Sequence, residues 1–251
     1  MDKKQREARR RQEDIALQRG LMWVAGAVVL EALLVLVNRY YINYYVNEID
    51  ILVTVDNVLR VLRAAAPAAT ILALLWTAWQ LKQGKKFGVP LAVTVGLGAV
   101  SVCAHVAIKF RGDGVSMLFW LVIDWAVLAL VFYIYQREFF LGACACSMSV
   151  LALWFIRYGG WPETILILAA IAVVSAAALW LKKSDGALPG KTKMQFLPQK
   201  TNYAILLTTC LASLVAVAAA MLLGGTAAYY LLYVMVAWLF ALFVYYTVKL
   251  M

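Results

Sequence analysis

Runs of about 20 apolar residues, separated by short polar links, dominate this sequence. A helix of roughly this length is what crosses a hydrocarbon core about 30 Å thick. The 251-residue chain is 65% hydrophobic and only 14% charged, far from the composition of an ordinary globular domain. A water-soluble core could not bury that much apolar surface. The sequence therefore predicts an all-α, polytopic integral membrane protein.

The apolar runs predict a bundle of about eight transmembrane helices, with little chain left for an aqueous domain. The expected spans are 20–42, 58–81, 87–108, 115–136, 139–156, 163–181, 203–223 and 226–248. They divide the chain into a basic leader (1–19), a six-span bundle (20–181), a basic loop (182–202) and a C-terminal two-span hairpin (203–251). Asp56 is placed to cap the second span, which Pro67 should kink or break.

Basic residues are distributed unevenly between the two sets of alternate links. Of the 23 Lys and Arg, 17 fall in the leader, in the links on the same side of the membrane and at Lys249. The positive-inside rule then places both termini in the cytoplasm, in a plasma (inner) membrane. The net charge of +10 does not indicate nucleic acid, because the leader and the 182–200 loop are placed to contact anionic lipid headgroups.

Two carboxylates lie deep inside apolar runs. Glu31 and Asp124 are each about nine residues, or roughly 14 Å, from the outer end of the predicted helix. A charged side chain at such a depth costs on the order of 3 kcal/mol or more, so intramembrane acids indicate function by default. The two either bind an ion or a solute in a polar cavity, or form hydrogen bonds across a helix contact.

The single histidine, His105, belongs to a polar stripe on one predicted helix face. The stripe either lines a cavity or packs against another helix; its members are Thr94, Gly98, Ser101, His105 and Lys109. One histidine excludes a multi-histidine metal site. Cys144 and Cys146 point to nearly opposite helix faces, so we expect neither a metal nor a cofactor.

A sequence pattern around Ser101 returns 48 residues later around Ser149, with a basic and aromatic pair eight residues beyond each serine. This pattern has two explanations. The first is that the chain contains tandem helical hairpins of like orientation, each with a polar residue at mid-depth. Alternatively, helices rich in alanine, serine and glycine produce such matches by chance.

Two functions from different classes remain open on these residues. The first is a small permease for a small solute, with Glu31, Asp124, Ser101, His105 and Ser149 as candidate ligands for the solute or a coupling ion. The second is a non-catalytic membrane scaffold or a subunit of a larger membrane complex. An enzyme acting on lipid or prenyl substrates ranks third, because the sequence contains no G-x-S-x-G, H-E-x-x-H or P-loop pattern.

Overall fold

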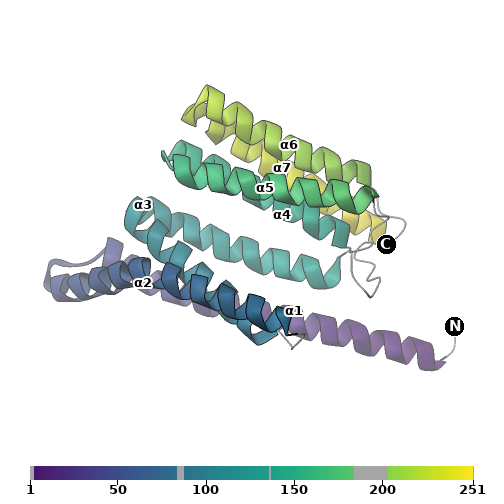
Figure 1. The fold of residues 1–251 in the computed structure, drawn as a ribbon, viewed down its shortest axis with the longest axis horizontal. Helices are drawn as coiled ribbons and strands as arrows, with labels where there is room; N and C mark the ends of the chain where they lie inside the picture. The colour runs from purple at the N-terminus through teal and green to yellow at the C-terminus, as the bar shows by residue number, and fades with distance from the viewer. Residues whose placement is uncertain (1–2, 84–87, 136, 184–202, 251) are drawn as a thin grey trace. The chain divides into compact units, whose positions relative to one another are not determined.

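The computed structural model describes residues 3–83, 88–135, 137–183 and 203–250. Within these ranges it contains seven helices that are long and apolar enough to cross a membrane. They are α1 (Lys3–Val37), α2 (Ile49–Lys82), α3 (Gly88–Ile134), α4 (Arg137–Arg157), α5 (Trp161–Lys183), α6 (Tyr203–Leu223) and α7 (Gly225–Leu250) (Figure 1). The predicted all-α polytopic membrane protein is confirmed.

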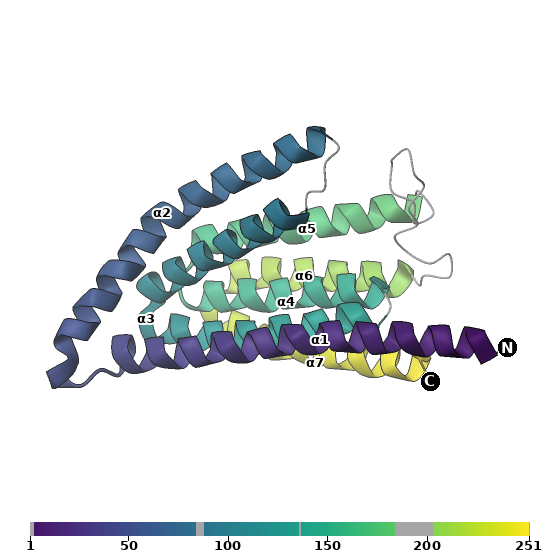
Figure 2. The same cartoon turned by 90° about the horizontal axis from the view of Figure 1, so that it is seen from below.

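The seven helices carry the eight predicted apolar runs because α3 contains two of them. Arg111, near the middle of α3, has φ 46° and ψ −120°, which is not a helical conformation. The carbonyl oxygen of Val106 lies 2.6 Å from where a Cβ of Gly114 would stand. A straight helix would separate these two residues by about 12 Å. The chain therefore turns back at Arg111, and Figure 2 shows α3 as two arms joined by a bend.

The length of α3 supports the same division. Its apolar part, Gly96–Tyr133, has 38 residues and would be about 57 Å long if it were straight. This is nearly twice the thickness of a hydrocarbon core. The predicted spans leave a polar link at residues 109–114. In the structure this link is shorter, because helix continues on both sides up to Arg111.

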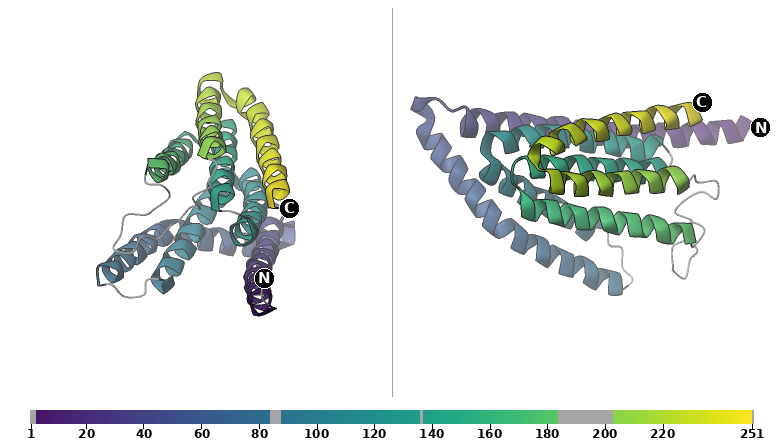
Figure 3. Two further views of the ribbon diagram at one scale, coloured as in Figure 1. Left: turned by 90° about the vertical axis from the view of Figure 1, so that its right-hand side faces the viewer. Right: turned by 90° about the horizontal axis from the view of Figure 1, so that it is seen from above.

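The chain forms two compact units, one of residues 25–123 and one of residues 1–24 with 124–251. In the second unit, α4 contacts α5, α6 and α7, and these four helices run side by side (Figure 3). Alanines, Cys146, Leu153 and Val217 are fully buried in the core of this bundle. Small side chains allow the helix backbones to approach closely, which is how helices associate within lipid.

Glycines in the left-handed region make the turns of this bundle. Gly159 has φ 77°, and the amide of Gly160 donates to the carbonyl of Phe155 at 2.7 Å, so α4 ends in a Schellman motif. Gly224 has φ 88° and is the single residue between α6 and α7. A residue with a Cβ would be strained at either position.

In the unit of residues 25–123, a π-helical turn (Asn38–Ile42) and a 3₁₀ turn (Val46–Glu48) connect α1 to α2. The helix α2 begins at Ile49, so the expectation of a start at residue 58 is wrong. Asp56 accordingly lies inside α2 and does not cap it; it accepts a hydrogen bond from Arg60 at 2.7 Å. The helix continues through Pro67 as a curved rod (Figure 2), so Pro67 does not break it.

The two basic segments expected at the membrane surface are only partly described. Residues 3–19 of the leader are helical and continue into the first span as a single helix, α1. Most of the basic loop at 182–202 lies outside the described residues, which end at Lys183 and resume at Tyr203.

Candidate functional site

Asp124 lies on the second arm of α3 and is half-buried. The hydroxyl of Ser147, on α4, donates a hydrogen bond of 2.9 Å to its Oδ1 atom. This contact corresponds to the second alternative for Asp124, a hydrogen bond across a contact between two helices.

Glu31 lies in the membrane-spanning part of α1 and is half-buried. Its Oε1 atom is covered and has no hydrogen-bond partner among the described residues. Such an oxygen is costly, because the group has lost water and has gained no donor in exchange. The two acids predicted from the sequence therefore differ: Asp124 is held by a neighbour, and Glu31 has a covered oxygen that no donor satisfies.

Glu31 and Asp124 belong to different compact units of the chain. The expectation that both acids reach one cavity therefore stays a prediction.

The polar stripe of α3 packs against α2 along its first half. The hydroxyls of Thr94 and Thr77 lie 3.0 Å apart, and a Cβ on Gly98 would lie 3.7 Å from the methyl group of Thr70. The first half of the stripe therefore contacts α2. Ser101 and His105, further along the stripe, are both half-buried.

Ser149 is fully buried in α4, and its hydroxyl donates to the carbonyl of Cys146 in its own helix at 2.7 Å. A serine inside an apolar helix commonly donates its hydroxyl hydrogen bond to a backbone carbonyl of the preceding turn in this way. Among the described residues, no three His, Cys, Asp or Glu side chains gather as they would around a metal ion. Cys146 and Cys210 are buried among apolar residues.

A buried ion pair joins the beginning of α4 to the end of α7. Glu138, in the first turn of α4, is 1% exposed and pairs with Lys249, in the last turn of α7. The aromatic rings of Phe139 and Tyr246 stack beside the pair at 4.9 Å. The sequence does not reveal this pair, because Glu138 and Lys249 are 111 residues apart and Lys249 by itself indicates only membrane orientation.

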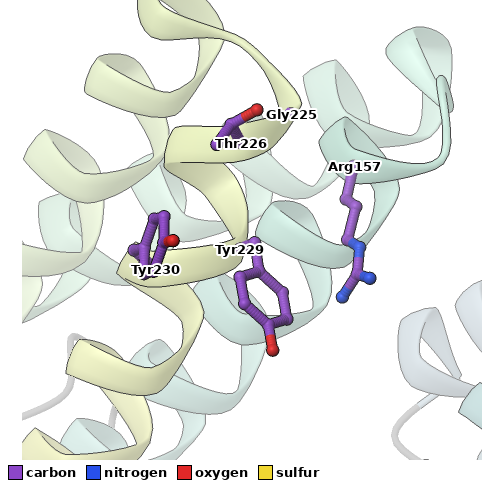
Figure 4. Close-up of a pocket in the computed structure, with 5 residues that line it drawn as sticks. All are labelled: Arg157, Gly225, Thr226, Tyr229 and Tyr230. Atoms are coloured by element: carbon purple, nitrogen blue, oxygen red, sulfur yellow. The ribbon is translucent and has the colours of Figure 1, made fainter.

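An open pocket of about 440 Å³ lies at the opposite ends of these two helices (Figure 4). It is lined by Arg157, Gly225, Thr226, Tyr229 and Tyr230. The guanidinium carbon of Arg157 lies 4.4 Å from the ring centre of Tyr229 and 5.4 Å from that of Tyr158. These distances are those of cation–π contacts. Arg157 and Tyr158 were predicted only as a basic and aromatic pair at a helix end.

The geometry thus provides two intramembrane acids in different surroundings, a buried ion pair and an arginine pocket. Comparison of the chain with protein-family models, with curated proteins and with solved structures gives no match.

Proposed function

We propose that this polytopic membrane protein moves a small solute across the bilayer, with Glu31 as the group that binds and releases a proton or a cation. The supporting observation is the covered Oε1 atom of Glu31, which has no donor among the described residues. Keeping an acid in a span costs about 3 kcal/mol or more. A proton or a cation bound at this oxygen would offset that cost.

Asp124 has a supporting role in this proposal. Its hydrogen bond from Ser147 fixes the second arm of α3 against α4. Ser101 and His105 remain candidate ligands on the first arm of α3, where both are half-buried. Ser149 has weaker support as a ligand, because its hydroxyl already donates a hydrogen bond to the carbonyl of Cys146 in its own helix.

The proposed setting is a plasma (inner) membrane with both termini in the cytoplasm. The excess of Lys and Arg in the leader and in alternate links supports this orientation. The reversal of the chain at Arg111 supports the even number of spans that this orientation needs. The leader and the 182–200 loop would then face the anionic lipid of the inner leaflet.

Transport is tested with the full chain reconstituted in phospholipid vesicles that contain a pH-sensitive dye. A pulse of acid or of Na⁺ outside the vesicles should change the internal pH faster than in protein-free vesicles. Glu31→Gln should abolish this response, because an amide has neither a titratable proton nor a negative charge to attract a cation. Asp124→Asn is the matched control and should retain most of the response. A wild-type response equal to that of protein-free vesicles, under both gradients, would exclude uncoupled movement of protons or exchange of Na⁺ for protons through Glu31.

Exchange at Glu31 has a second, independent measurement. A hydrophobic carbodiimide attacks protonated carboxyl groups in apolar surroundings, and mass spectrometry of peptides locates the adduct. Modification of Glu31 should decrease as the pH or the Na⁺ concentration rises, since loss of the proton or binding of the cation removes the reactive form. If Glu31 stays unmodified at every pH, it is not an exchanging group.

A membrane scaffold or subunit is the second candidate, and a different observation favours it. Only 6% of the α1 span and 11% of the α2 span are buried, compared with 56% of the α4 span. Apolar helices with so little burial within their own chain face either lipid or another membrane protein.

The two candidates differ in what accompanies the purified chain. A subunit should co-purify in mild detergent with a stoichiometric partner that photo-crosslinks to positions on α1 and α2, such as Val29 and Leu72. Both of these side chains are exposed. Crosslinks to lipid alone, from a chain that purifies as a monomer, would eliminate the scaffold and leave the transport proposal to its own test.

A further inference from the structure

We propose that the pocket of Arg157, Gly225, Thr226, Tyr229 and Tyr230 binds the phosphate of an anionic phospholipid headgroup. The first ground is the state of the Arg157 side chain. Its guanidinium contacts the rings of Tyr158 and Tyr229, and within the described part of the chain it forms no ion pair and no hydrogen bond. Ring contacts use the face of the guanidinium and leave its N–H groups available. Two of these donors match two phosphate oxygens.

The second ground is the set of polar groups around Arg157. The hydroxyl of Tyr233 donates to the hydroxyl of Tyr229 at 3.2 Å, so the proton of Tyr229 remains available to another acceptor. Figure 4 shows the side chains of Arg157 and Tyr229 extending to the same side. Thr226 adds a hydroxyl to the lining. The pocket therefore offers donors of three kinds, as a phosphate with several acceptor oxygens requires.

The third ground is the close approach of the two helix ends. A Cβ on Gly225 would lie 3.6 Å from both the Cα and the carbonyl oxygen of Arg157. This separation is ordinary van der Waals contact, so the first turn of α7 lies directly against the last residue of α4. The amides at the start of α7 thus lie near the arginine and add to the positive potential.

The depth of the pocket favours a lipid over free phosphate. Arg157 is the last residue of one span, and Gly225 is the first residue of another, so the pocket lies at the level of the headgroups. Leu222 and Leu223, which precede the turn, are 88% and 73% exposed and offer apolar surface to acyl chains. The pocket is open, as a site for a headgroup whose chains remain in the bilayer must be.

The test is native mass spectrometry of the full chain in neutral detergent, titrated with phosphatidylglycerol, phosphatidylcholine or inorganic phosphate. The wild-type chain should prefer phosphatidylglycerol, and Arg157→Gln should weaken this binding about tenfold. Tyr229→Phe keeps the ring and should weaken it about twofold. Arg157→Lys keeps the charge without the paired donors and should fall between the wild type and Arg157→Gln.

Arg63→Gln is the matched control, because Arg63 is exposed on α2 and lies outside the pocket. It should bind phosphatidylglycerol as the wild type does, and circular dichroism should show equal helix content in all variants. Equal affinity of the wild type and Arg157→Gln for phosphatidylglycerol would overturn the proposal. Displacement of the lipid by inorganic phosphate at comparable concentration would also overturn it, in favour of a site for free phosphate.

Discussion

Two alanine-rich stretches of this chain have similar sequences and different surroundings. In α4, Gly142, Ala143, Ala145 and Cys146 are all buried. In α2, Ala66 is buried, whereas Ala64, Ala65 and Ala68 are exposed. Small residues permit close helix packing, but they do not bring a second helix to the site. Burial in α4 arises because three other helices, α5, α6 and α7, contact it.

The ion pairs of the two regions differ in the same way. Arg39 binds both carboxylate oxygens of Glu48, nine residues away, at 2.9 and 3.1 Å, and both side chains remain partly exposed. Glu138 and Lys249 are 111 residues apart, and the glutamate is almost completely buried. The Arg39–Glu48 pair stabilises the turns between α1 and α2, and the Glu138–Lys249 pair connects α4 to α7.

Lys249→Met should have the largest effect, since it leaves the buried carboxylate of Glu138 without its cation. We expect a loss of about 3 kcal/mol in the free energy of unfolding, measured by denaturation in mixed micelles. The double variant Glu138→Met/Lys249→Met should lose much less, because no uncompensated charge remains. Equal losses in the single and double variants would show that the pair does not hold α4 and α7 together.

Ala152→Leu should come next, because it adds volume where the bundle has none. Ala152 is 0% exposed in the core of α4–α7, and such overpacking costs about 1–3 kcal/mol. Ala68→Leu on α2 is the matched control. Its side chain is exposed, so the same change should alter the unfolding free energy by less than about 0.5 kcal/mol.

Ser147→Ala should lower the unfolding free energy by about 1 kcal/mol, the size measured for hydrogen bonds between membrane helices. It removes the donor to Asp124 and leaves that carboxylate half-buried. Ser147→Thr keeps the hydroxyl and serves as the control. A neutral effect of Ser147→Ala would mean that water or another group replaces the serine, and Asp124 would then be accessible for ion binding.

Arg39→Met should have the smallest effect, below about 1 kcal/mol, because exposed ion pairs contribute little to stability. The change should raise hydrogen exchange locally, in the turns between α1 and α2, without changing the denaturation midpoint of the bundle. A loss as large as that of Lys249→Met would contradict the contrast between the two regions.

Most of the helices were predictable, because the length of each apolar run sets the length of the helix that crosses the membrane. The spans at 203–223 and 139–156 match α6 and α4 within two residues at either end. The start of α2 was missed because Asp50, Asp56 and Asn57 resemble a polar loop. In the structure, Asp56 is satisfied within the helix by Arg60 and from outside it by Tyr41, at 3.2 Å. A local pattern does not reveal such a partner.

The candidate site was predictable only as a set of residue types. Deep acids stand out in an apolar run, so Glu31 and Asp124 could be found from sequence. That Ser147 binds Asp124, and that Oε1 of Glu31 has no donor among the described residues, depends on which helices are neighbours. The pocket at Arg157 was also hidden, because α4 and α7 meet there from positions 68 residues apart in the chain.

Sequence alone determined that this protein is a polytopic bundle of helices, because the free energy of transfer into lipid depends on the composition of each run. It also determined that acids remain inside those runs. Tertiary structure alone decided that α4 is the central helix of the α4–α7 bundle, that Glu138 pairs with Lys249, and that α3 turns back at Arg111. These features depend on contacts between distant segments, and hydrophobicity, which has no direction, cannot specify them.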